Sequence, residues 1–351
     1  MGVDRGYLPP LDGIRALAVV AVVLFHTLIF WFPGGGVGVD VFFVLSGFLI
    51  TRILVAELDR TGRISFGNFY LRRALRLLPA LFALAIPLTV AYLLLLDGER
   101  QRESLFAVFA AVAYISSPVM ASGHHLGPLT HTWSLSVEEY FYIVWPLVLL
   151  LVTVRAKRFR LPIIAAVAAL AVVYRLTVTL AGWPVERVHY AADTRASDLL
   201  IGCVLALVLV RYRLPLREVC AVPATLFLVA FVVLPDTLTS PFYRYGGFLA
   251  VAVAAAVMIT IVVQGPQGAT ARVLGTPPLV WIGKRSYGIY LWNPPISALA
   301  GFALPQWIPA IPVVLVLSFL VPALSYRVVE TPFLRLKSRL PRKTVRVPAP
   351  Q

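Results

Sequence analysis

The sequence contains little cysteine and little charge. It has two cysteines, Cys203 and Cys220, in or beside apolar segments, so neither a disulfide framework nor a cysteine-based metal site is expected. Charged residues make up 13% of the 351 residues, whereas apolar residues make up 60%. Soluble domains rarely exceed about half apolar residues. The composition therefore predicts an integral membrane protein without a metal site.

Acidic residues are scarce as well, and the net charge is +15. The basic residues fall in short segments between apolar runs, a pattern that argues against nucleic-acid binding and informs membrane orientation instead. The first apolar run is of span length and lacks a small-residue cleavage site near its end. We therefore expect it to remain as the first membrane helix.

Ten apolar runs approach the roughly 20 residues that a membrane span requires. They are 13–32, 38–57, 76–96, 135–154, 161–181, 197–211, 218–235, 245–264, 286–304 and 308–329. If an eleventh run, 104–121, does not cross, the basic clusters all lie on one side of the bilayer. The positive-inside rule then predicts an all-α polytopic protein of about ten spans in the cytoplasmic membrane. Both termini are cytoplasmic in this topology, and 104–121 is a re-entrant or surface segment.

We expect one membrane domain, residues 1–335, and a basic, disordered cytoplasmic tail, residues 336–351. No internal repeat is visible, and the sequence carries no sign of the oligomeric state. The bilayer itself is the first predicted partner.

The first span places ionisable residues where lipid is expected. Arg15 and His26 are eleven residues apart in "GIRALAVVAVVLFHTLIFWF", about three helical turns, so they share one face about 16 Å apart. Ionisable groups in a membrane normally face a protein interior or a water-filled cavity. Asp12 is spaced to pair with Arg15. His26 suits general-base chemistry, and a structural histidine in a helix interface is the alternative.

Two further stretches carry charge at the ends of predicted spans. In "NFYLRRALRLLPAL", Arg72, Arg73 and Arg76 could hold the phosphates of a cytoplasmic donor or anchor the helix at anionic lipid headgroups. In "PGGGVGVDVFFVLSGFLITRIL", Asp40 begins a span, where the helix dipole alone would favour it. Ser46, in the same stretch with a following glycine, indicates a close contact between helices.

The densest polar stretch is "HTWSLSVEEYFYIVWP", residues 131–146. Glu138 and Glu139 point about 100° apart on a helix, so one of them is expected to face a pocket. Such a carboxylate could orient the ring of His26 in the same leaflet. Ser136 belongs to the same predicted pocket.

Other polar residues recur at helical spacing in the predicted outer half or at span ends. Each alone is an ordinary interface residue, and together they describe a polar chamber. They are Arg175, then Asp193, Arg195 and Asp198 in "DTRASDLL", and Tyr287, Tyr290 and Asn293 in "SYGIYLWNPP". Spacing and composition leave two functions open: an enzyme, or a transporter of a small polar or lipid-linked substrate whose path these charges form.

Seven stretches in one order favour the enzyme. The chain resembles the acyltransferase type 3 family, integral-membrane enzymes that O-acylate sugars, surface polysaccharides and some glycosylated antibiotics. The matching stretches span residues 11–335 and are "LDGIRALAVVAVVLFH", "GGGVGVDVFFVLSGFLIT", "FYLRRALRLLPAL", "TWSLSVEEYFYIVWP", "DTRASDLLIG", "SYGIYLW" and "VVETPFLR". Their combination is specific, whereas any one of them would be weak. Some relatives carry a fused esterase-like domain, and we expect this chain to be the stand-alone form.

The resemblance implies an acyl-CoA donor, usually acetyl-CoA, and a hydroxyl acceptor on a cell-surface glycan or a glycosylated small molecule. No bound cofactor is implied. Arg15 and His26 match the family's basic residue and histidine, with His26 as the base. Arg73 and Arg76 match its Arg-x-x-Arg motif, and Glu138 or Glu139 matches its glutamate. The resemblance therefore implies direct transfer or a covalent acyl-histidine relay.

One position departs from the family pattern. The family continues after "SYGIYLW" with a histidine, and this chain has Asn293. An asparagine can still position a substrate through hydrogen bonds. The departure leaves a catalytically dead relative as a further alternative.

Overall fold

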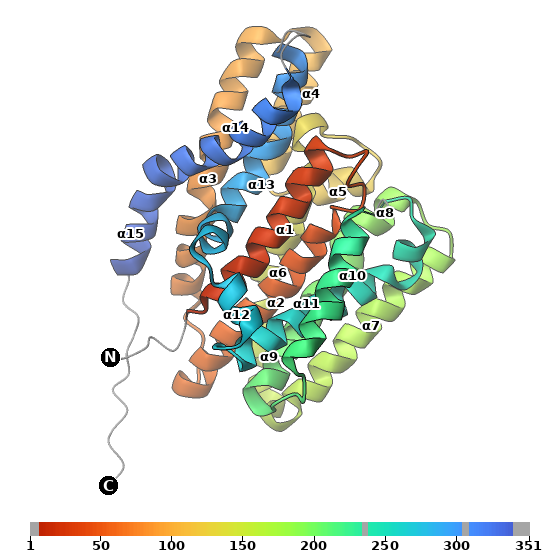
Figure 1. Ribbon diagram of the computed structural model, residues 1–351, viewed down its shortest axis with the longest axis vertical. Helices are drawn as coiled ribbons and strands as arrows, with labels where there is room; N and C mark the ends of the chain where they lie inside the picture. Colours follow the sequence, from red (N-terminus) through yellow and green to blue (C-terminus); the bar gives the residue numbers. More distant parts are fainter. Residues whose placement is uncertain (1–6, 234–237, 304–308, 340–351) are drawn as a thin grey trace.

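The computed structural model describes residues 7–233, 238–303 and 309–339, and these residues form helices joined by short connections. The longer helices are α1 (Pro9–Thr27), α2 (Val37–Thr61), α3 (Phe66–Leu95), α4 (Gly98–Val112), α6 (Trp133–Ala156), α7 (Arg160–Leu180), α9 (Ala192–Arg211), α10 (Ala221–Val233), α11 (Phe248–Gln264), α13 (Pro277–Ala303) and α14 (Ala310–Ser325). The shorter ones are α5 (Ser116–Ala121), α8 (Val185–Tyr190), α12 (Ala269–Leu274) and α15 (Thr331–Arg339). Figure 1 shows them gathered into one bundle.

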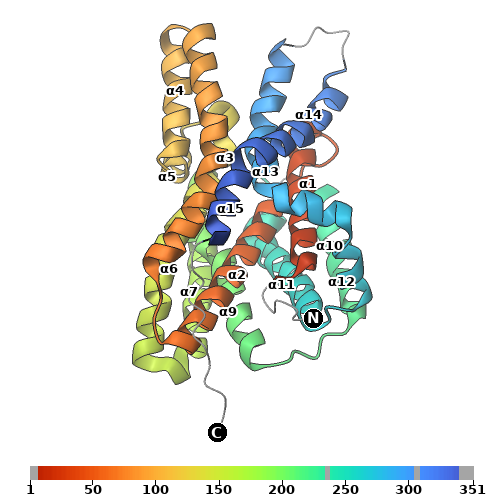
Figure 2. The same cartoon turned by 90° about the vertical axis from the view of Figure 1, so that its left-hand side faces the viewer.

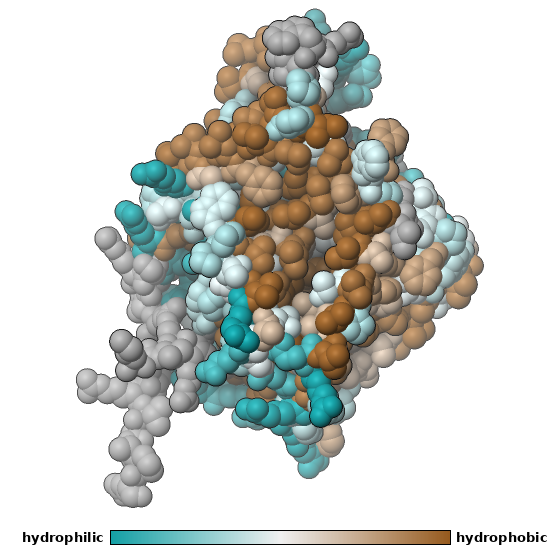
Figure 3. Space-filling view, in the orientation of Figure 1, coloured by the Kyte–Doolittle hydropathy of each residue, from teal (hydrophilic) through white to brown (hydrophobic). Residues whose placement is uncertain are grey.

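Among the described residues, six helical stretches are long and apolar enough to cross a membrane. They are Pro9–Thr27, Val37–Thr61, Phe66–Leu95, Gly127–Leu180, Tyr243–Gln264 and Ala310–Lys337. The fourth contains both α6 and α7. Apolar side chains cover the middle of the face in Figure 3, and hydrophilic ones gather at its lower end. The predicted all-α polytopic membrane protein is confirmed, while the count of ten spans and the orientation stay predictions.

The predicted boundaries need two corrections. The first span was expected at 13–32, but α1 ends at Thr27 because a proline and three glycines follow shortly after. Helix α15 continues to Arg339 and packs against α3, so residues 336–339 are not part of a disordered tail. Residues 340–351, and residues 234, 235, 304 and 308 of the predicted spans, lie outside the described ones.

The segment 104–121 does not form one continuous helix. Its residues are divided between α4 and α5, and Tyr114 between them adopts a positive φ of 56°, which few residues other than glycine favour. Figure 2 shows α4 lying beside the upper part of α3, so that these helices form one of two hairpins projecting at that end; α13 and α14 form the other. The re-entrant or surface character of 104–121 stays a prediction.

Glycines allow the closest helix contacts in the bundle. Helix α2 packs against α9 along a long stretch, and a Cβ at Gly47 would meet the backbone of Leu199. Helix α1 packs equally extensively against α13, where a Cβ at Gly283 would meet the backbone of Asp12. The close contact expected after Ser46 is confirmed at Gly47. These contacts hold α2 against α9 and α1 against α13.

Candidate functional site

A cavity of about 260 Å³ lies between α1, α2, α3, α6 and α13. Its polar lining residues are Tyr7, Asp12, Arg15, Ser46, Arg73, Arg76, Ser134, Glu138, Tyr142, Ser286, Tyr287 and Tyr290. Ser134 precedes Tyr142 by eight residues on α6, which is about 12 Å along a helix. We call the part lined by Arg15, Arg73 and Arg76 the arginine end, and the part lined by Ser134 and Tyr290 the hydroxyl end.

At the arginine end, Asp12 is fully engaged by two donors. Arg15 Nη1 donates to Asp12 Oδ1 over 2.7 Å, and the Tyr7 hydroxyl donates to Oδ2 over 2.7 Å. Burial, followed by this hydrogen bond, raises the pKa of the Tyr7 phenol above its usual value, so Tyr7 remains a neutral donor. The predicted pairing of Asp12 with Arg15 is present. The acidic charge of Asp12 is therefore neutralised within the site.

Arg73 and Arg76 are the other cations that line this end, and Glu139 and Glu330 lie within electrostatic range of them. Arg73 stacks on Tyr142 with its guanidinium carbon 3.0 Å from the ring centroid, and Arg76 is exposed. Helix α15 brings Lys337 within electrostatic range of both. Arg72 lies within range of Lys337 but does not line the cavity. Sequence reasoning missed Lys337 because it assigned that residue to the tail; the basic run "RLKSR" directly after a helical stretch was the signal.

Glu138 lies in the cavity wall between the two ends. The Ser46 hydroxyl donates to its Oε1 over 2.6 Å, which joins α2 to α6. The prediction that a glutamate orients His26 is not supported by this geometry, because Glu138 pairs with Ser46 and His26 bonds within its own helix. Glu139 lies within electrostatic range of Arg73 and Glu138 but does not line the cavity.

His26 is partly buried in the last turn of α1, beyond the hydroxyl end of the cavity. Its Nδ1 lies 2.9 Å from the carbonyl oxygen of Val22. A carbonyl only accepts, so Nδ1 carries the proton and Nε2 keeps a free lone pair. The ring faces that of His131, with centroids 6.3 Å apart. Sequence reasoning missed His131, although it is the first residue of the dense polar stretch.

The hydroxyl end is closed by a hydrogen-bonded group. The hydroxyls of Tyr290 and Ser134 lie 2.6 Å apart, and Tyr290 donates to the backbone oxygen of His131 over 2.6 Å. Of the three polar residues predicted on this helix, Tyr287 and Tyr290 line the cavity. Asn293 is buried one turn further and donates to Thr27 over 3.2 Å and to Ser318 over 2.8 Å.

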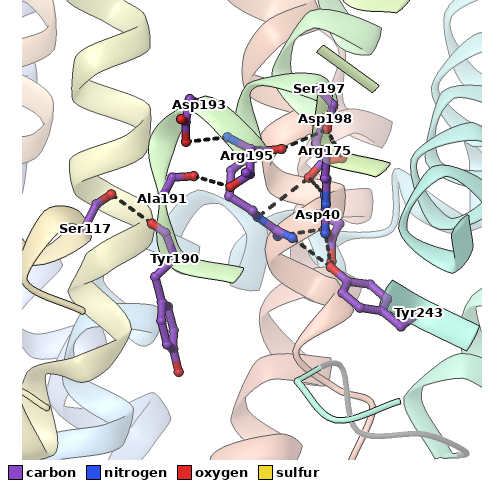
Figure 4. Close-up of polar contacts among 11 residues, drawn as sticks. Asp40, Ser117, Arg175, Tyr190, Ala191, Asp193, Arg195, Ser197, Asp198 and Tyr243 are labelled. Atoms are coloured by element: carbon purple, nitrogen blue, oxygen red, sulfur yellow. Dashed lines mark hydrogen bonds and ion pairs between the residues drawn. The ribbon is translucent and has the colours of Figure 1, made fainter. Parts of the chain in front are cut away.

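A separate buried network contains five residues (Figure 4). Four of them were predicted to line the pocket, and the fifth, Tyr243, was not predicted. Arg195 donates to Asp40 over 2.7 Å and to the Tyr243 hydroxyl over 2.8 Å, and Arg175 donates to Asp198 over 3.3 Å. All five side chains are at most 2% exposed, and none lines the cavity. The prediction that Asp40, Arg175, Arg195 and Asp198 line the substrate pocket is therefore corrected, because they satisfy one another.

Two more predicted pocket residues lie elsewhere. Asp193 is exposed and accepts two hydrogen bonds from Arg187, of 2.8 and 2.6 Å. This pairing raises the pKa of the Arg187 guanidinium above its usual value. Ser136 is buried and bonds the backbone oxygen of Thr132 over 3.4 Å. Asp193 thus holds α8 to α9, and Ser136 is satisfied within its own helix.

The described residues contain no group of three or more side chains that could hold a metal ion. The predicted donor, acyl-CoA, is a substrate and needs no resident cofactor. The residues able to meet an anionic group are those of the arginine end, and the residues able to meet a carbonyl or hydroxyl group lie at and beyond the hydroxyl end.

Comparisons with known proteins point to one family. A family described as acyltransferase domain matches residues 9–327. Peptidoglycan O-acetyltransferase OatA of Listeria monocytogenes is 35% identical over 350 residues, covering 94% of this chain and 56% of that protein. Putative peptidoglycan O-acetyltransferase YrhL of Bacillus subtilis is 38% identical over 313 residues, covering 84% of this chain and 49% of that protein. The chain thus spans about half the length of these relatives. No solved structure matches it.

Proposed function

The chain belongs to the acyltransferase family that matches residues 9–327, and from this premise we propose that it moves an acetyl group from acetyl-CoA to a hydroxyl group of a cell-envelope glycan. The observation that carries the proposal is the central cavity, which is lined by three arginines at one end and by hydroxyl groups at the other. One similar protein is named peptidoglycan O-acetyltransferase and another putative peptidoglycan O-acetyltransferase, which favours a glycan acceptor.

The arginine end suits the phosphates of acetyl-CoA. Arg73 and Arg76 are one helical turn apart on α3 and both line the cavity. Guanidinium groups bind phosphate oxygens in a bidentate manner. Several cations held close together repel one another, so a bound polyanion would stabilise this arrangement. Acetyl-CoA would lie with its phosphates here and its acetyl thioester toward Tyr290.

His26 supplies the base in this proposal. Its Nε2 lone pair takes the proton of the acceptor hydroxyl, the hydroxyl oxygen bonds to the thioester carbonyl carbon, and the carbon–sulfur bond breaks. The departing thiolate takes the proton from His26, which leaves free CoA and an O-acetyl ester. The Tyr290 ring lines the cavity and contacts His131, so the acetyl group must pass beside this ring to reach His26.

A covalent alternative uses the same residues. His26 Nε2 would attack the thioester, and the carbon–sulfur bond would break to release CoA as its thiolate. The acceptor hydroxyl would then attack the acetyl-histidine, the carbon–nitrogen bond would break to restore His26, and the hydroxyl proton would pass to the thiolate. The predicted orientation puts the arginine end at the cytoplasm and His26 in the outer half of the membrane. Asn293, where the family has a histidine, bonds Thr27 and Ser318. These bonds support a structural role for that position.

Membranes containing the protein test the proposal when they are supplied with acetyl-CoA labelled in the acetyl group and with peptidoglycan fragments. We compare wild type with His26→Ala and, as a matched control, with His124→Ala, an exposed histidine. Label should reach the glycan with wild type and His124→Ala, and fall at least about 100-fold with His26→Ala, since a general base contributes about 10²–10⁴.

Other results have distinct meanings. Undiminished transfer by His26→Ala would remove His26 as the base but leave the acetyltransferase. Absence of transfer from acetyl-CoA to any glycan by the wild type would overturn the proposed function. Acid-labile label retained on wild-type protein but absent from His26→Ala would select the covalent route.

A further inference from the structure

We propose that His131 is a second catalytic histidine, whose ring N–H donates to the carbonyl oxygen of the acyl group as the acceptor attacks it. This inference rests on the proposed function and assigns a residue to the oxyanion that every acyl transfer to a hydroxyl must form. It is argued from the burial, the ring contacts and the backbone support of His131.

His131 is buried without a side-chain partner. It is 3% exposed, and neither ring nitrogen meets the geometry of a hydrogen bond with any group among the described residues, although the backbones of Pro128 and Leu291 lie close to the ring. An unmet buried polar group costs about 1–3 kcal/mol, and such a group in a folded protein calls for an explanation. A ligand group that occupies the site during the reaction would provide the missing partner.

The ring of His131 lies between the cavity and the proposed base. It contacts Tyr290, a lining residue of the cavity, with ring centroids 5.2 Å apart. It also contacts His26, at 6.3 Å between centroids. An acyl group that leaves the hydroxyl end of the cavity for His26 Nε2 therefore meets the imidazole of His131. The two histidines come from α1 and from the 3₁₀ helix Gly127–Thr132, just before α6.

The backbone around His131 is held in place before any substrate arrives. Tyr290 donates to the backbone oxygen of His131. The next residue, Thr132, donates to the Leu129 carbonyl over 2.7 Å and lies 2.8 Å from the Ser116 hydroxyl. A donor aimed at developing charge is most effective when it needs no reorganisation during the reaction. The hydrogen bonds around His131 provide that rigidity.

Two neutral imidazoles divide the chemistry. His26 Nε2 removes the proton of the acceptor hydroxyl, the carbon–oxygen bond forms, and the carbonyl electron pair moves to the oxygen. The N–H of His131 donates to this oxyanion and keeps its own proton. The carbonyl then re-forms, the carbon–sulfur bond breaks, and the thiolate receives the proton from His26. In the covalent route, His131 serves the same oxyanion in both half-reactions.

The test compares His131→Leu, which removes the donor, with His131→Gln, which keeps an N–H donor of similar reach. Loss of one oxyanion donor costs about 10²–10³ in kcat. We expect that loss of kcat for His131→Leu, with an unchanged KM for acetyl-CoA. The kcat of His131→Gln should be at least tenfold higher than that of His131→Leu. His189→Leu and His189→Gln are the matched controls, because His189 packs against Trp133 and Tyr190 and is outside the proposed site.

Thermal unfolding in detergent and binding of acetyl-CoA are measured on the same samples. A kcat loss in His131→Leu with unchanged unfolding temperature, relieved in His131→Gln, supports the proposal. Wild-type rates in His131→Leu would overturn it while leaving the proposed function intact. If His131→Leu and His131→Gln lost kcat equally and both had a lowered unfolding temperature, the proposal would be overturned, and His131 would have only a packing role. Absence of acetyl transfer by wild type would overturn both proposals together.

Discussion

The protein contains two clusters of arginines that have a similar sequence pattern but different surroundings in the structure. In the buried network, two arginines meet two aspartates, and all are at most 2% exposed. At the arginine end of the cavity, Arg73 and Arg76 face open space, while the nearby Asp12 is already paired with Arg15. Buried and paired charges stabilise a fold, whereas charges that line an open cavity are available to a ligand. The burial of the arginines is therefore more informative than their number.

Breaking the sealed network should give the largest effect. Asp40→Asn leaves Arg195 buried with one fewer countercharge, and removing one partner of a buried pair typically costs about 3–5 kcal/mol. We expect a lowered unfolding temperature and less folded protein in the membrane. Thermal unfolding in detergent is the measurement, with Asp193→Asn at the exposed pair as control. A variant as stable as wild type would mean that the network contributes nothing to folding.

Arg76→Gln tests the accessible cluster. A hydrogen bond to a charged group contributes about 1.5–3 kcal/mol, so we expect the KM for acetyl-CoA to rise by about 10- to 100-fold at unchanged unfolding temperature. Arg60→Gln, an exposed arginine outside the cavity, is the control. If Arg76→Gln instead lowered stability and left the KM unchanged, the two clusters would not differ in the way described.

Ionic strength should separate the clusters without mutation. Accessible charges are screened by salt, with a Debye length of about 10 Å at 0.1 M and 3 Å at 1 M, and buried pairs much less. Raising potassium chloride from 0.1 to 1 M should increase the KM for acetyl-CoA several-fold and leave the unfolding temperature nearly constant. A salt-independent KM would argue against phosphate recognition at the arginine end.

Lys337→Gln should have the smallest effect. Lys337 lies on α15 near the arginines and is not among the cavity lining residues, so it acts on the donor through longer-range attraction of about 0.5–1 kcal/mol. The KM for acetyl-CoA should rise about two- to fivefold. Lys157→Gln, which removes a cation that pairs with Asp59 elsewhere, should leave it unchanged. A Lys337→Gln effect as large as that of Arg76→Gln would place Lys337 in direct contact with the donor.

The sequence was sufficient for features that depend on short spacings. Asp12 and Arg15 are three residues apart and do pair, and Arg73 and Arg76, one turn apart, do line one cavity. The all-helical membrane fold followed from the lengths of the apolar runs. These predictions rest only on the helical repeat and on the free-energy cost of placing a charged side chain in lipid.

Features that depend on distant parts of the chain could not be predicted in this way. Asp40 and Arg195 are 155 residues apart, so their pairing followed only from the packing of α2 against α9. The partner of Glu138 is Ser46, 92 residues earlier, where the sequence suggested His26. His131 was overlooked because the adjacent carboxylates attracted the functional interpretation. A single sequence identifies the polar residues within the membrane spans, but it does not show which of them line the cavity and which form the buried network.

The contact at Gly283 has a consequence for mutational tolerance. No side chain fits there without displacing the backbone of Asp12, and overpacking of this kind costs about 1–3 kcal/mol. A saturation scan scored by activity should therefore rank Gly283 with the residues that handle substrate, although it offers no functional group. In this protein, a position can be intolerant to substitution because two helices pack closely there or because its side chain takes part in the reaction. A parallel scan of protein abundance would separate the two causes.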